Sequence, residues 1–497
     1  MRLAMARGRS GPSATPPSMG TKPRVAPSID TKRRAAAKSR GSRSSPEQSL
    51  SSWCLSHQAR AALDRWGSTL CSKVQAARAP LFHSLGVRLS WPCERQLAVG
   101  TDCSGAEAPI WALRAMGVPH SHVFSCDINA DVRSFIAATC PPTGPIFDDM
   151  LTRSRSDIPP HTLYVCGFPC KPFSTLRRHS TKFLREATAR PFFEVLRVLR
   201  EHSPKLVVLE NVQGITAVLD RVLRHIRSVP GYFLWVVPID SADLGEPVRR
   251  PRLYFVLVRQ DCAVSKNLET LDTIVRELCR VAREGVKDHV SQRMLPSSSP
   301  AVKQFVEKLR ADRQQKPRGV GSSGRPLVHA PMNIAGILLP RQLRVWAALK
   351  AKHPCGDLVA DVSQSVQRAH GSCSGVAPTL MPGGVVILER AGRPIMAIEK
   401  LLLHGFPIHR MGMPTSTPNS VLSSLGGNTM HLKSVGLSLL LGISLIDWSS
   451  SIAQSTPPLA RSSPAARFPL QLSGKRQHVH DQGKKSLHPT KQARHNS

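Results

Sequence analysis

The 497-residue sequence predicts an α/β fold, a doubly wound and mostly parallel sheet, with a second, smaller and irregular domain. Three observations support this prediction. Between residues 96 and 258, short apolar runs typical of buried strands alternate with segments of helical periodicity. Acidic residues follow several of these runs, where open α/β sheets bind their ligands. Between about 260 and 390 the alternation stops, and residues 297–325 are rich in Lys, Arg, Ser, Pro and Gly.

The first part of the sheet is expected from apolar runs that end in polar turns. We expect strands at 96–100, 122–126 and 162–166, with a further strand ending at Asp148-Asp149. Helices are expected at 106–116, where Ile110, Leu113 and Met116 share one face, and at 131–139. The strand at 162–166 ends at Gly167 and Pro169, which break strands.

The rest of the chain divides into one returning core segment and several less regular ones. A helix at 192–201 leads to a strand at 205–209, and strands at 234–239 and 253–258 complete the sheet. Further helices are expected from Arg393 to Gly405-Phe406-Pro407 and from 430 to 445. The expected units are a disordered basic arm (1–50), a short helical extension (51–93), a catalytic domain (94–259 and 420–447), a second domain (260–419) and a disordered basic tail (448–497).

The charge of the chain indicates a polyanionic partner. The formal net charge is +35 and the pI is about 10.8. Residues 1–50 hold 11 Lys/Arg and two acids, and residues 451–497 hold eight and one, so the two ends account for part of the surplus. The middle still has 49 basic and 30 acidic residues. Nucleic acid is the simplest partner for such a chain.

Twelve cysteines without CxxC pairs indicate reduced thiols inside a cell, and neither a disulfide framework nor a metal site is expected. No apolar run is long enough for a membrane span, so no membrane partner is expected, and a monomer is assumed. The N-terminal arm contains Lys32-Arg33-Arg34 with Lys38 and Arg40, which favours the nucleus. Its Arg- and Ser-rich, acid-poor composition also suits an organellar transit peptide.

Four acids follow predicted strands: Asp102, Asp127, Asp149 and Glu210. Each alone could cap a helix, but four at successive strand exits favour a ligand crevice. An acid after the second strand, here Asp127, commonly binds a ribose hydroxyl pair. The first turn lacks the GxGxxG spacing of a dinucleotide site, and Glu107 would repel a pyrophosphate. A cationic cofactor without phosphates, such as S-adenosylmethionine, suits this turn better.

Cys170 is the candidate nucleophile. An unperturbed thiol has a pKa of about 8.5, and the nearby cations Lys171, Arg177 and Arg178 would increase its thiolate fraction. The alternative is a buried, inert cysteine, which the flanking proline and basic loop disfavour. The Cys-x5-Arg spacing of a phosphatase is missed by one position, because the first arginine is Arg177.

Several motifs together resemble those of the cytosine-5 DNA methyltransferases. Gly167-Phe168-Pro169-Cys170 with Phe173-Ser174 resembles the catalytic loop of that family, and Glu210-Asn211-Val212 its Glu-Asn-Val motif. Arg250-Pro251-Arg252 is similar to its paired-arginine motif. The segment from Arg393 to Pro407 and Gly427-Asn428 resemble its last two motifs. The motifs stand in the family's order across residues 96–447.

The resemblance implies a Rossmann-like methyltransferase sheet, a target-recognition domain at 260–419, and transfer of a methyl group from S-adenosylmethionine to C5 of a flipped cytosine in DNA. It assigns Cys170 as the nucleophile that adds to C6, Glu210 as the partner of N3 and the exocyclic amine, and Arg250 and Arg252 as holders of O2 and the loop. Cofactor contacts are implied for Asp102, Cys103, Ser104, Gly105, Asp127, Asp149, Pro169, Asn428 and Thr429. DNA contacts are implied for Lys171, Ser174, Arg177 and Arg178.

The chain also departs from the family pattern. Its first motif reads Cys103-Ser104-Gly105-Ala106-Glu107, and Lys171 and Val248 stand where the family usually has glutamine. Glu107 could contact the amino group of the cofactor or favour the helix start. Three alternatives remain: a tRNA methyltransferase of the related branch, whose Cys-Phe-Thr signature is not found; a catalytically silent nucleic-acid-binding relative; and, more distantly, an α/β thiol hydrolase, for which no histidine follows a strand.

Overall fold

The computed structural model describes residues 55–169, 187–283, 287–315, 336–354, 356–414 and 416–449, together with Gly285 and Ile334. The predicted nucleophile Cys170 and the predicted DNA contacts Lys171, Ser174, Arg177 and Arg178 lie outside these residues. The arm predicted at 1–50 and the tail from 450 onward also lie outside them.

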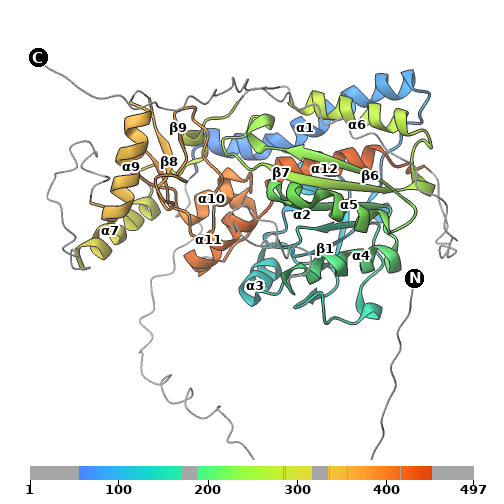
Figure 1. Ribbon diagram of the computed structural model, residues 1–497, viewed down its shortest axis with the longest axis horizontal. Helices are drawn as coiled ribbons and strands as arrows, with labels where there is room; N and C mark the ends of the chain where they lie inside the picture. The colour runs from blue at the N-terminus through green and yellow to red at the C-terminus, as the bar shows by residue number, and fades with distance from the viewer. Residues whose placement is uncertain are drawn as a thin grey trace, which may run out of the picture.

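A seven-stranded sheet organises the molecule, and its strand order is β3-β2-β1-β4-β5-β7-β6 (Figure 1). Strands β1 to β5 pair in parallel, whereas β7 is antiparallel to both of its neighbours. This is the predicted doubly wound, mostly parallel sheet. The strands are β1 (Ala98–Asp102), β2 (Ser121–Cys126), β3 (Ile146–Phe147), β4 (Leu163–Cys166), β5 (Leu206–Val212), β6 (Tyr232–Ile239) and β7 (Arg252–Arg259).

Alternate residues of the central strands enter two separate cores, as the two-residue period of a strand requires. Leu163 and Val165 of β4 pack into one core, and Tyr164 and Cys166 into the other. The first core is covered by α2 (Ala108–Ala115), α3 (Ala130–Thr139) and α12 (Leu432–Ser444), and the second by α4 (Arg190–His202) and α5 (Leu219–Arg227). Both faces of the sheet are therefore buried.

A long N-terminal helix, α1 (His57–Ser84), extends the first core. It packs against α6 (Leu268–Arg283), α12 and α2, and α1 and α6 run side by side in Figure 1. Trp66 of α1 is buried against Gly436 of α12. The segment expected to hold one or two short helices thus contributes one helix of 28 residues to the main core.

A smaller sheet lies beside the main one, with the order β11-β10-β8-β9 (Figure 1). Helix α9 covers it through Trp346. The elements are α7 (Pro300–Gln315), α9 (Pro340–Lys352), β8 (Val359–Asp361), β9 (Gly371–Ser372), β10 (Val386–Leu388), β11 (Arg393–Pro394), α10 (Ala397–Leu403) and α11 (Asn419–Asn428). Although α6 and α10 fall within 260–419, both contribute apolar side chains to the main core. The division into domains stays a prediction.

Some element bounds differ from those expected. The first strand begins at Ala98, because Glu94–Gln96 forms a 3-10 turn in which the Gln96 side chain accepts a bond from the Cys93 N–H. The helix expected from Arg393 begins at Ala397, since Arg393-Pro394 pairs with β10 as a strand. The predicted tail begins at 448, yet Trp448 is buried and its indole N–H donates to the Ile443 carbonyl.

The described ranges lack two further features. None of the helices there is both long and apolar enough to cross a membrane. The same ranges hold no cluster of three or more His, Cys, Asp or Glu side chains that could bind a metal ion.

Candidate active site

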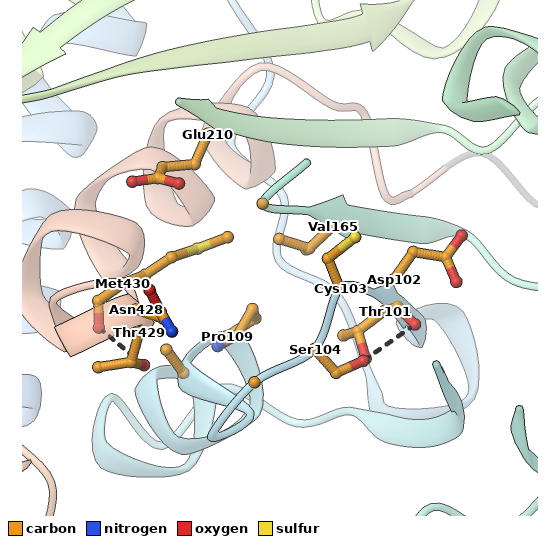
Figure 2. A pocket seen from close by; sticks show the side chains of 13 residues that line it. Thr101, Asp102, Cys103, Ser104, Pro109, Val165, Glu210, Asn428, Thr429 and Met430 are labelled. Carbon is orange, nitrogen blue, oxygen red and sulfur yellow. Dashed lines mark hydrogen bonds between the residues drawn. The ribbon is translucent and has the colours of Figure 1, made fainter. Parts of the chain in front are cut away.

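A pocket lies where β1, β4 and β5 end and α11 meets α12 (Figure 2). Its described lining contains two carboxylates, of Asp102 and Glu210, and no lysine, arginine or histidine. The lining residues are Thr101, Asp102, Cys103, Ser104, Gly105, Ala108, Pro109, Val165, Gly167, Glu210, Asn428, Thr429 and Met430. Six of the predicted cofactor contacts are thereby brought to one place, together with Glu210.

Glu210 is held by an arginine of the neighbouring strand. The Arg252 Nε lies 2.8 Å from Glu210 Oε1, and both side chains are about one-tenth exposed. Antiparallel pairing of β5 with β7, in which Val212 faces Arg252, brings the two residues together. The carboxylate is therefore oriented by a partly buried ion pair and keeps its second oxygen toward the pocket.

The strand exit before Cys170 lies against this carboxylate. A Cβ placed on Gly167 would be 3.5 Å from Glu210 Oε2 and 2.9 Å from Met430 Cε. A Cβ here would displace the end of the Met430 side chain and come into van der Waals contact with the carboxylate. Two residues separate Gly167 from Cys170 in the sequence.

Asn211, beside Glu210 in β5, supports the same strand exit. Its buried Nδ2 donates to the Phe168 carbonyl at 3.0 Å, and its Oδ1 accepts from the Val212 N–H. The Glu-Asn-Val segment thus presents a carboxylate and holds the backbone of Phe168, two residues before Cys170. The sequence placed Asn211 in a motif but gave it no role.

Arg250 occupies a different position from Arg252. Its guanidinium is buried and donates to the Gly427 carbonyl at 3.3 Å from both Nη1 and Nη2. The backbone N–H of Arg250 donates to Asp240 Oδ1. Arg250 does not line the described pocket; it ties the end of β6 to the end of α11, where Asn428 begins the cofactor contacts predicted from the C-terminal side.

The Asp102 carboxylate forms hydrogen bonds with two buried side chains. Arg153 donates to both of its oxygens at 2.6 Å, and the Tyr164 hydroxyl donates at 2.5 Å. Burial and the nearby Asp102 carboxylate raise the pKa of Tyr164, which stays a donor. In Figure 2 the Asp102 side chain points away from Glu210 and Met430. Arg153 could not be foreseen as its partner, since 51 positions separate them in the chain.

The loop after β1 is held in a left-handed conformation. The φ angles of Cys103, Gly105 and Glu107 are 51°, 56° and 57°. Ser104 Oγ accepts from the Cys126 N–H at 3.0 Å and lies 3.1 Å from the Cys126 carbonyl oxygen, which joins this loop to the end of β2. The Gly105 N–H donates to Asp127 Oδ2 at 3.1 Å.

Comparison with known proteins decides the family. The model of the C-5 cytosine-specific DNA methylases matches residues 103–408, which is more than half of the chain. The chain belongs to the C-5 cytosine-specific DNA methylase family. Family members are S-adenosylmethionine-dependent methyltransferases, so this cofactor is expected in general terms.

The methylase relatives differ greatly in length. A DNA (cytosine-5-)-methyltransferase of Verticillium dahliae is 24% identical over 69% of this chain, and one of Cryptococcus neoformans is 26% identical over 70%; the matches cover 19% and 17% of those proteins. The chain therefore spans about a fifth of their length. A type II methyltransferase of Haemophilus aegyptius is 34% identical over 22% of this chain and 35% of its own. The S. pombe Dnmt2 methyltransferase structure aligns with 69% of this chain and 98% of its own, at 16% identity and a TM-score of 0.45.

The methylase pocket fits a cationic, phosphate-free cofactor. The Asp127 carboxylate is half-buried outside the described lining; it accepts from the Gly105 and Asn129 N–H groups, and each oxygen keeps a lone pair for a ribose hydroxyl. Burial raises its pKa, which the two backbone N–H donors partly offset. A lining of hydroxyls and carboxylates without cationic side chains suits a sulfonium ion and would not favour a pyrophosphate.

The other predicted cofactor contacts lie partly inside and partly outside the described lining. Asn428 and Thr429 line it from α11. Asp149 lies outside the described lining in a loop anchored by Arg153, and its Oδ1 accepts from the Leu151 N–H. Pro169 is also outside that lining, at the edge of the described chain. Met430, which the sequence did not single out, lies between α11 and α12, and its side chain extends into the pocket below Glu210 in Figure 2.

Proposed function

We propose that this chain transfers a methyl group from S-adenosylmethionine to C5 of cytosine in DNA, through a covalent adduct of Cys170 with a base flipped out of the duplex. One observation carries the proposal: Glu210, oriented by Arg252, lies against Gly167 at the strand exit that leads to Cys170. The carboxylate thus lies where the chain enters the segment that carries the candidate thiolate. The predicted cofactor pocket opens beside this carboxylate.

The chemistry requires an activated ring, because C5 of cytosine is not nucleophilic by itself. The Cys170 thiolate adds to C6 and forms a carbon–sulfur bond, while the Glu210 carboxyl group protonates N3 and accepts from the exocyclic amine. The electron pair displaced from the C5–C6 bond makes C5 nucleophilic. Covalent addition in this way divides one difficult substitution into easier steps.

When bound, S-adenosylmethionine supplies the methyl group as an electrophile. The protein then completes the reaction: the C5 proton is lost to a base, the C5–C6 double bond re-forms, the Cys170 thiolate leaves, and N3 returns its proton to Glu210. Arg252 keeps Glu210 in place throughout and offers N–H groups to O2 of the base. Arg250 supports the cofactor side by holding the Gly427 carbonyl.

DNA is proposed as the substrate on the basis of the family and the charge. The net charge of +35 suits a polyanion, and counterion release from phosphates would dominate the affinity. A tRNA substrate has the same charge and the same base chemistry. The assay must therefore compare DNA and tRNA as substrates.

The proposal is tested by methyl transfer from labelled S-adenosylmethionine to unmethylated duplex DNA and, in parallel, to unmodified tRNA. We expect label at C5 of cytosine in DNA, and none with Cys170→Ser or Glu210→Gln. Glu277→Gln on α6, a partly exposed glutamate paired with Arg280, serves as the matched control and should retain the activity. Label in tRNA alone would refute the substrate, and label retained by Cys170→Ser would refute the covalent route.

A further inference from the structure

Glu107 is a buried carboxylate beneath the predicted cofactor loop. The whole residue is inaccessible to solvent, and its φ of 57° lies in the left-handed region that favours glycine. It stands at the N-cap of α2 but caps no backbone N–H there. Its carboxylate is also absent from the described lining of the pocket. Its carboxyl group therefore neither lines the described pocket nor caps a backbone N–H of α2.

Its carboxyl group instead joins the two strand ends that carry the cofactor contacts. Oε1 accepts from the Thr101 hydroxyl of β1 at 2.8 Å and from the Ser125 hydroxyl of β2 at 2.6 Å. Thr101 is further bonded to Ser104 at 2.7 Å. Thr101 and Ser104 line the pocket, and Asp127 follows β2 directly. The carboxyl group therefore lies one side chain behind the cofactor.

The second oxygen, Oε2, is buried and has no hydrogen-bond partner in the described structure. The titratable and charged groups around the carboxyl are His122 of β2, Asp127 after it, and Cys140 after α3, with Arg114 of α2 near His122 and Cys140. The His122 Nε2 is 3.7 Å away, but burial and Arg114 lower the pKa of His122 to about 4, so it is neutral. No cation in the described chain forms an ion pair with Glu107.

We propose that Glu107 is a positioning residue whose carboxylate braces the cofactor loop from behind and whose uncompensated negative charge favours the cationic S-adenosylmethionine over its neutral thioether product. The inference rests on the proposed function for the identity of the cofactor. Methyl transfer removes the positive charge of the sulfonium, so a negative charge beside the pocket assists exchange of product for fresh cofactor.

The charge of Glu107 makes this preference depend on pH. Burial raises the pKa of Glu107 to about 7, although the Ser125, Thr101 and Ser104 hydroxyls act in the opposite direction and Asp127 in the same one. The carboxyl is therefore mostly neutral at pH 6 and mostly ionised at pH 8. The α-amino group is common to both ligands and cancels in the ratio of their affinities.

The test is calorimetric titration of the full chain with S-adenosylmethionine and with S-adenosylhomocysteine at pH 6 and pH 8. In the wild type, the affinity for S-adenosylmethionine relative to S-adenosylhomocysteine should rise about tenfold from pH 6 to pH 8. This is the effect expected for one charge acting across roughly 10 Å at an effective dielectric constant of about 20. In Glu107→Gln, which keeps the size and the Oε1 acceptor, the ratio should not change with pH. Ser125→Ala removes one brace and keeps the charge, so the pH dependence should persist.

The outcomes separate this inference from the function on which it rests. The ratio of the two affinities could change with pH to the same extent in the wild type and in Glu107→Gln, or could be independent of pH in both. Either result overturns the role of Glu107, while the cofactor assignment stands. A wild-type protein that binds neither ligand overturns the proposed function and this inference together. If Glu107→Gln does not fold, a pH-independent ratio in Ser125→Ala overturns the inference.

Discussion

Substitution of Glu107 by glutamine should change how the stability of the fold depends on pH. The buried carboxyl has a pKa raised from 4.5 to about 7, chiefly by burial. Between these values the folded state binds more protons than the unfolded state, so the free energy of unfolding falls as the pH rises. The protonated Glu107 carboxyl group makes its full contribution to the free energy of unfolding below pH 4.5, and this contribution is lost as the pH rises through 7. Glu107→Gln removes this titration.

The size of the effect follows from the shift. One pKa unit corresponds to about 1.4 kcal/mol, so the full shift is worth about 3 kcal/mol. Between pH 5 and pH 8, where part of the penalty is already present at the lower limit, the difference amounts to about 2.5 kcal/mol. Glu107→Gln should therefore gain about 2.5 kcal/mol relative to the wild type when the pH is raised from 5 to 8.

Urea unfolding followed by tryptophan fluorescence at pH 5, 6, 7 and 8 measures this difference. Subtracting the wild-type curve cancels every other titrating group. Glu277→Gln on α6 is the matched control: hydrogen bonding by Arg280 lowers the pKa of Glu277, which stays ionised over this range, so its difference should be flat. A flat difference for Glu107→Gln as well would refute the account of a buried carboxyl that ionises near neutral pH.

Three further substitutions test the geometry of the site. Arg153→Met leaves the buried Asp102 carboxylate without its ion-pair partner and should cost about 3–5 kcal/mol in urea unfolding; a loss below about 1 kcal/mol would contradict the buried pair. Asn211→Ala leaves the Phe168 carbonyl without its donor and should cost about 1–3 kcal/mol and lower kcat, while calorimetry gives an unchanged Kd for the cofactor; an unchanged kcat would show that the bond does not position the loop. Gly167→Val should abolish methyl transfer yet retain the fold by circular dichroism, because its side chain enters the space beside Met430 and Glu210; retained transfer would contradict the placement of Gly167.

Much of the sheet could be predicted from the sequence, because its central strands are short apolar runs buried on both faces. Residues 163–166 and 206–209 are entirely buried. Gly167 follows the end of the first strand, whereas the second strand continues through Glu210 to Val212. The order of the motifs along the chain also led to the family. These patterns are local in the sequence, so they can be recognised without knowledge of the tertiary structure.

The rest depended on contacts between distant parts of the chain. Asp102 lines the pocket, and the partners of its carboxylate, Arg153 and Tyr164, are 51 and 62 positions away in the sequence. Arg250 and Arg252 were treated as one motif, yet the first holds α11 and the second holds Glu210. Two arginines that are two positions apart in the sequence can therefore contact different parts of the structure.

Helix α6 was missed although its pattern was present. Its buried residues repeat with the spacing of a helix face: Leu271, Ile274, Val275, Leu278, Cys279 and Ala282. The charged residues between them obscured this pattern within a region that seemed irregular throughout. A separate count of helical spacing in this region would have found it.

The central claim is that Cys170 forms a covalent bond to cytosine beside Glu210. The most direct measurement is trapping on duplex DNA that contains 5-fluorocytosine, in which fluorine at C5 prevents the loss that releases the enzyme. In the presence of S-adenosylmethionine we predict a complex that survives denaturation, with the mass of protein, DNA and one methyl group, and no such complex with Cys170→Ser. A wild-type protein that binds the cofactor and the DNA but forms no adduct would contradict the claim.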